Sequence, residues 1–157
     1  MLCFILAGQF ERLTADYAAC MHTELFQATD QDCQLPFLVW QLYYCACGQY
    51  SKACLSGYET KRLQFKKTEF AFGYEHLLAA LVAGDGALFS QQLQSRADAF
   101  ARRQRSRKDD ALWGYGGAGR DCFDVLGTAI CRLAWRRGMQ FTPVPERFYP
   151  PLFWQGE

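Results

Sequence analysis

The sequence of 157 residues has no long apolar run, no excess of one charge and few histidines. No uninterrupted apolar stretch approaches the roughly 18 residues of a membrane-spanning helix, so we expect no such helix. The apolar start, residues 1–7, lacks a basic n-region and is soon followed by Glu11 and Arg12, so we expect no signal peptide. The formal net charge is +1, which excludes a global electrostatic attraction to nucleic acid or to an anionic membrane.

Catalytic sequence motifs are also lacking. The chain contains no Walker A loop, no Rossmann fingerprint, no HExxH and no GxSxG. The glycine-rich stretch 114–119 lacks the Lys-Ser/Thr pair and the preceding strand that a phosphate cradle needs. We therefore assign no catalytic residue and no cofactor-binding residue, and we expect no cofactor.

The eight cysteines include no CxxC pair. Several lie inside apolar helical patterns, which indicates reduced, buried thiols in a cytosolic protein. A metal site is the alternative, with Cys45, Cys47 and Cys54 as ligands and His22 or His76 as the fourth. Two cysteines separated by one residue point roughly 200° apart on a helix, so we assign no metal ligand.

The apolar periodicity predicts helices. A chain of this length is expected to form one domain, and its 50% hydrophobic residues can fill a core. Apolar residues recur at spacings of three and four over residues 1–26, 35–50, 68–83, 87–103 and 121–137. From about residue 139 the chain is proline-rich, and we expect residues 141–154 to lie extended on the surface. The prediction is an all-α, single-domain bundle of about five helices over residues 1–157, with an extended, Pro-rich C-terminal tail.

The last predicted helix is apolar on most of its surface, which indicates a central position in the bundle. Asp121 is its expected N-cap, and Gly138 can adopt the left-handed conformation that ends a helix. One polar line interrupts the apolar surface at helical spacing: Asp124, Thr128 and Arg132. This line is either a buried network, in which Asp124 accepts hydrogen bonds from Thr128 or a neighbouring helix, or one wall of a cleft.

The least helical internal segment, residues 102–120, combines a basic run with a glycine-rich stretch that carries Trp113 and Tyr115. Arginine beside tryptophan and tyrosine is typical of protein–protein hot spots. Nucleic acid is not the expected partner, because two aspartates partly cancel the basic run. The predicted partner contacts are Arg105, Arg107, Asp109, Asp110, Trp113 and Tyr115, with Glu146 and Arg147 in the tail as second choice.

The second half of the chain resembles a known family in the order of its segments. An apolar helix ends in Gly-Asp (GYEHLLAALVAGD, residues 73–85) and is followed by an arginine-rich helix. Later, DVLGTAICRLAWRRGM (residues 124–139) runs into a tail that ends in FYPPL (residues 148–152). This order is similar to that of small all-helical immunity proteins of bacterial polymorphic-toxin and type VI secretion systems. The resemblance covers residues 70–152.

The resemblance implies a cytoplasmic protein that is not an enzyme. Such a protein acts in bacterial competition by binding a cognate toxin effector, whose active site it plugs or which it holds inactive. Two alternatives stay open: a small helical enzyme that uses Glu75 or Asp124 with His76, and a nucleic-acid-binding accessory protein that uses the basic run. A surplus of aromatic residues also leaves room for a homodimer, whose seam the sequence does not place: Trp113, Phe148, Tyr149, Phe153 and Trp154.

Overall fold

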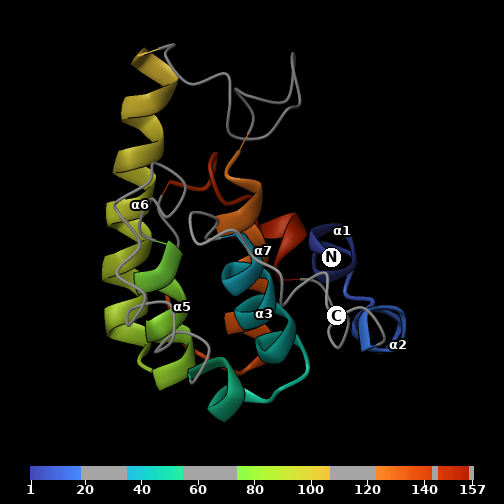
Figure 1. The fold of residues 1–157 in the computed structure, drawn as a ribbon. Helices are drawn as coiled ribbons and strands as arrows, with labels where there is room; N and C mark the ends of the chain where they lie inside the picture. Colours follow the sequence, from blue (N-terminus) through green and yellow to red (C-terminus); the bar gives the residue numbers. More distant parts are fainter. Residues whose placement is uncertain (19–34, 55–73, 107–122, 143–144, 156–157) are drawn as a thin grey trace.

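The computed structural model describes residues 1–18, 35–54, 74–106, 123–142 and 145–155 (Figure 1). Within these ranges the regular elements are helices, with no strand, which confirms the predicted all-α class. A short helical stretch also occupies residues 50–54. The elements in chain order are α1 (Leu2–Leu6), α2 (Phe10–Ala18), α3 (Leu35–Ala46), α5 (Tyr74–Ala83), α6 (Gly86–Ser106), α7 (Val125–Arg136) and the 3-10 helix η3 (Pro151–Phe153).

Helix α7 is the centre of the fold, as predicted. Every residue from Leu126 to Ala134 is buried. Helices α1, α3 and α5 and the 3-10 helix η3 all contact α7, and Figure 1 shows it between the α5–α6 pair and the α1–α2 pair. A helix that is apolar nearly all round is stable in such a position, because each of its faces has a neighbour.

The start of α7 differs from the prediction. Asp124, rather than Asp121, is the N-cap: its backbone is extended, and its side chain accepts a hydrogen bond from the backbone N–H of Gly127 at 3.0 Å. Asp121 itself lies outside the described residues. A side-chain bond to the third helical residue is the usual geometry of an aspartate cap, and here it also directs the carboxylate toward the core.

Two glycines end helices earlier than the periodicity predicted. Gly8 (φ 71) stops α1, so the single helix expected over residues 1–26 is two helices, α1 and α2, as far as Ala18. Gly48 (φ 72) likewise ends α3 at Ala46 rather than near residue 50. The left-handed backbone conformation is accessible to glycine and closes the last helical turn. Apolar spacing runs through both breaks and therefore did not reveal them.

Helices α5 and α6 form the predicted antiparallel hairpin (Figure 1). Gly84 (φ 74) ends α5, and the carboxylate of Asp85 accepts from the backbone N–H of Leu88 at 2.9 Å, which caps the start of α6. Leu93 and Ala97 lie on the buried face of α6, as their helical spacing predicts, and the face differs from that spacing only in the first turn. Phe89 is fully buried there, whereas Leu88 is 38% exposed.

The predicted extended surface tail is not confirmed: parts of the described C-terminal segment pack on α6, and Trp154 contacts Trp135 of α7. Gln140 lies against Gly86, where any side chain would collide with the Gln140 carbonyl oxygen. Farther along, the ring of Phe141 contacts that of Phe89, and the ring of Phe148 contacts that of Phe100. Prolines prevent further α-helix here, but they did not predict that this segment would supply core residues: Phe148, Tyr149 and Trp154.

Candidate functional site

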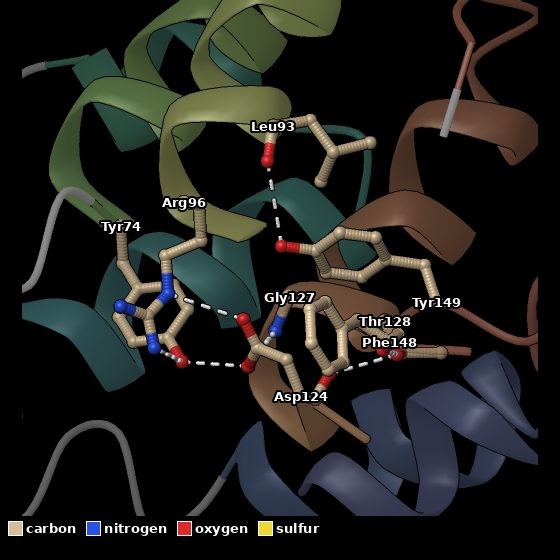
Figure 2. A network of polar contacts seen from close by, with 8 residues as sticks. All are labelled: Tyr74, Leu93, Arg96, Asp124, Gly127, Thr128, Phe148 and Tyr149. Carbon is tan, nitrogen blue, oxygen red and sulfur yellow. Dashed lines mark hydrogen bonds and ion pairs between the residues drawn. The ribbon is translucent and has the colours of Figure 1, made fainter. Parts of the chain in front are cut away.

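A buried ion pair joins α6 to the start of α7 (Figure 2). The Nε atom of Arg96 donates to one carboxylate oxygen of Asp124 at 3.1 Å, and both side chains are at most 3% exposed. The hydroxyl of Tyr74, from α5, donates to the other carboxylate oxygen at 2.6 Å and accepts from Arg96 at 2.6 Å. Three helices therefore meet at one carboxylate, which also caps α7 through Gly127.

Burial and charge determine the protonation of this cluster. Burial, and next the negative charge of Asp124, raise the pKa of Tyr74 well above its ordinary value, so the phenol stays neutral. Burial alone would lower the pKa of Arg96, but Tyr74 and Asp124 outweigh it and the pKa is raised. The guanidinium also lies over the Tyr74 ring, 4.0 Å from its centroid. A buried cation, its anion and a neutral hydroxyl satisfy one another here.

The same region connects α7 to the C-terminal segment. The backbone N–H of Asp124 donates to the Phe148 carbonyl at 3.0 Å, and the Thr128 hydroxyl donates to the Asp124 carbonyl at 2.7 Å. The Tyr149 ring lies against Gly127, where an added Cβ would be 2.7 Å from a ring carbon. The polar line of α7 is thus a buried network rather than a cleft wall: Asp124 and Thr128 are in it, and Arg132 is 5% exposed.

This network holds together two of the regions predicted to contact a partner. Phe100 on α6 packs edge-to-face on Phe148, with 5.2 Å between the ring centroids. Next to Phe148, Glu146 and Arg147 are exposed, and the Arg147 guanidinium lies 4.5 Å from the Phe148 ring centroid. Arg105 is in the last turn of α6, beyond Phe100. The end of α6 and the Glu146–Arg147 turn therefore lie at the same end of the bundle. The other predicted contacts fall outside the described residues: Arg107, Asp109, Asp110, Trp113 and Tyr115.

Of the residues in the alternative enzyme hypothesis, Glu75 and His76 are neighbours, whereas Asp124 lies apart from His76. His76 is exposed, and its Nε2 atom lies 3.7 Å from the neighbouring Glu75 carboxylate. Asp124 instead bonds Tyr74, two residues before His76 on α5. Positions two apart on a helix point roughly 200° away from each other. His76 therefore faces away from the side of α5 that meets Asp124, which excludes a His76–Asp124 pair; Glu75 and His76 remain neighbours at the surface of α5.

The cysteines described by the structure are free: Cys3, Cys45, Cys47, Cys54 and Cys131. Burial raises the pKa of the Cys45 thiol to about 12 and that of Cys131 well above its ordinary value. Neither thiol is therefore a nucleophile near neutral pH. Within the described ranges, no group of three or more His, Cys, Asp or Glu side chains is arranged to hold a metal ion.

Sequence reasoning missed three members of the network: Arg96, Tyr74 and Tyr149. For Arg96 a signal was present. It falls between Leu93 and Ala97 on the buried face of α6, so an arginine there required a buried partner. Tyrosines at apolar positions carried no such signal, because a buried phenol looks like any aromatic core residue in a periodicity pattern.

Comparisons of the chain with protein-family models, with curated proteins and with solved structures find no match. In the part of the chain that is described, no helix has both the length and the apolar character needed to cross a bilayer.

Proposed function

We propose that this chain is a cytoplasmic immunity protein that binds a cognate bacterial toxin effector and neutralises it by protein–protein contact. The proposal began with the order of segments from residue 70 to residue 152. What supports it in the molecule is the way α6, α7 and the Glu146–Arg147 turn are fixed to one another by the Arg96–Asp124 network.

A binding protein of this kind gains affinity from a surface that is ordered before contact. Ordering a surface during association costs free energy that a rigid surface does not spend. The contact region we propose begins at the last turn of α6 with Arg105 and includes Glu146 and Arg147. Its side chains of both signs suit a polar rim around an apolar centre. The loop residues Arg107, Asp109, Asp110, Trp113 and Tyr115 complete the proposal.

The experiment is capture of the tagged full-length chain from the cytosol of its own cells, with mass spectrometry of what stays bound after a high-salt wash. The proposal predicts a single protein, retained in a one-to-one ratio, that is toxic when expressed alone. The high-salt wash removes nucleic acids bound through their phosphates, because the affinity of such binding falls steeply with ionic strength. A chain that retains nothing, or that retains only nucleic acid before the wash, overturns the proposal.

Charge reversal at the turn locates the surface. We expect Glu146→Arg with Arg147→Glu, which leaves the net charge unchanged, to weaken capture. The matched control is Gln91→Arg with Ser95→Glu on α6, since both positions are exposed and this change also leaves the net charge unaltered. Equal capture by both variants would place the contact elsewhere.

A further inference from the structure

A second charged surface lies at the other end of the bundle, and its cations share one feature. Each lies over an aromatic ring: Arg12 over Phe4, Lys52 over Tyr44, Arg136 over Phe10 and Arg137 over Tyr50, with centroid distances of 5.5, 5.7, 3.9 and 4.0 Å. We name these four residues the cationic end. In Figure 1, α2 and residues 47–54 lie in the lower half of the view, whereas α6 ends at the top.

The cationic end is continuous across three elements. Arg12 and Arg136 line one depression of about 420 Å³, whose other lining residues are Gly8, Gln9, Phe10 and Glu11. The Thr14 hydroxyl lies 3.5 Å from the Cys47 sulfur, which joins α2 to the end of α3. From there the chain leads to Tyr50, which carries Arg137, and then to Lys52.

Two of these cations are held in place by backbone hydrogen bonds as well as by rings. Arg136 donates to the carbonyl of Ala46, at the end of α3, and Arg137 donates to the carbonyl of Leu81, in the last turn of α5. A cation at a helix C-terminus interacts favourably with the helix dipole. Both guanidinium groups are therefore ordered before any partner arrives, which lowers the entropy lost on binding.

We propose that the cationic end is a docking surface for an acidic protein segment, with an apolar side chain of that segment in the depression over Phe10. Guanidinium groups bind carboxylates through paired, charge-assisted hydrogen bonds. Arginine packed on aromatic rings is also the composition of interface hot spots. This inference does not depend on the proposed function, because it concerns the opposite end of the bundle.

A protein segment fits this surface better than nucleic acid does. Glu11 lines the depression and Asp16 lies beside Arg12, so carboxylates are interspersed among the cations. A phosphate backbone carries regularly spaced negative charge and would meet these carboxylates wherever it crossed the surface. A protein segment can place its carboxylates over the arginines and an apolar or neutral residue near Glu11.

The test measures binding of a fluorescein-labelled synthetic peptide that repeats Glu-Glu-Phe-Gly to the full-length protein, by fluorescence anisotropy at low and moderate salt. We expect saturable binding that weakens with salt, and a loss of about tenfold or more in affinity for Arg12→Glu with Lys52→Glu. A second variant, Arg12→Gln with Lys52→Gln, should lose less. Circular dichroism checks that each variant keeps its helix content.

Two controls decide the result. Arg102→Glu with Arg147→Glu makes the same change in net charge at the other end of the bundle, where both residues are exposed, and we expect it to bind the peptide nearly as well as the unaltered protein. The same peptide with glutamine in place of glutamate should not bind. Absence of peptide binding, an equal loss in both charge-reversal variants, or tighter binding of single-stranded DNA of equal charge would each overturn the proposal.

Discussion

The guanidinium of Arg96 and the carboxylate of Asp124 lie 3.1 Å apart at a point where neither side chain is more than 3% exposed. This pair brings α6 to the first turn of α7, and Tyr74 adds α5. Breaking a buried pair is costly because the remaining charge has lost both water and its partner. The pair is therefore expected to determine how these three helices fit together.

The first prediction concerns the charge of Asp124. Asp124→Asn keeps the size of the side chain and an oxygen that can cap α7, but it removes the negative charge that pairs with Arg96. We expect it to lower the free energy of unfolding by about 3 kcal/mol, measured by urea denaturation. The control is Asp98→Asn on the exposed side of α6, expected to change stability by less than about 0.5 kcal/mol. If the two variants were equally stable, the ion pair would not be holding the helices.

The second prediction compares two buried tyrosines. The Tyr74 hydroxyl makes hydrogen bonds of 2.6 Å to both Asp124 and Arg96, whereas the Tyr149 hydroxyl lies 3.4 Å from the Leu93 carbonyl. Tyr74→Phe should cost about 2 kcal/mol, because it leaves two charged groups short of a partner. Tyr149→Phe removes one long bond and should cost less than about 1 kcal/mol. Equal losses in thermal or urea denaturation would contradict this assignment.

The third prediction concerns why glycine is required at positions 127 and 138, where the physical reasons differ. A Cβ at Gly127 would lie 2.6 Å from an Asp124 carboxylate oxygen, whereas a Cβ at Gly138 (φ 77) would meet nothing within 4 Å. Gly127→Ala should destabilise the protein by about 1–3 kcal/mol through crowding, despite the better helix propensity of alanine. Gly138→Ala should cost about 1 kcal/mol through backbone strain.

Substitution by asparagine distinguishes crowding at Gly127 from backbone strain at Gly138. Because asparagine tolerates the left-handed conformation, Gly138→Asn should recover part of the stability lost in Gly138→Ala. Gly127→Asn should be worse than Gly127→Ala, since the larger side chain adds to the crowding. The opposite order at either position, in urea denaturation, would show that its cause is wrongly assigned.

The fourth prediction is a loss of stability at alkaline pH. Burial raises the pKa of Cys45 from 9.0 to about 12 and also raises the pKa values of Cys131, Tyr74 and Tyr149. A raised pKa in the folded state means that the unfolded chain loses its proton first. The protonated thiols and phenols therefore contribute their full stability to the folded state below about pH 9. This contribution is lost as the pH rises toward the pKa values of these groups in the folded protein.

The ionisation of Cys45 alone should lower the free energy of unfolding by about 1.4 kcal/mol for each pH unit between pH 9 and pH 12. Urea denaturation under reducing conditions at several pH values measures it. Cys45→Ala should have a shallower slope than the unaltered protein, and Cys54→Ala, at an exposed position, should not. Parallel slopes for all three proteins would contradict the burial of Cys45.

Apolar spacing predicted the helices better than it predicted their ends. The central position of α7 followed from its sequence, because so few of its positions are polar. The breaks at Gly8 and Gly48 did not, since apolar residues continue on both sides of each glycine. Local conformation, rather than burial, decides these breaks.

The candidate site was predictable only in part. Asp124 stood out as a carboxylate on an apolar helix, and a buried network was one of its two interpretations. Its partners could not be named, because Arg96 and Tyr74 are 28 and 50 residues away along the chain, and helical spacing carries no information on which helices meet. The packing of residues 140–149 along α6 was likewise invisible, since proline content indicates what a segment cannot form rather than where it lies.

The most direct test of the proposed function is a growth assay. The protein captured at high salt would be expressed in a bacterial host, alone and together with the full-length chain. We predict that it stops growth alone and that the chain restores growth. The chain with Glu146→Arg and Arg147→Glu should restore growth less well than the chain with Gln91→Arg and Ser95→Glu. A captured protein that is harmless alone, or whose toxicity the chain does not reduce, would contradict the assignment as an immunity protein.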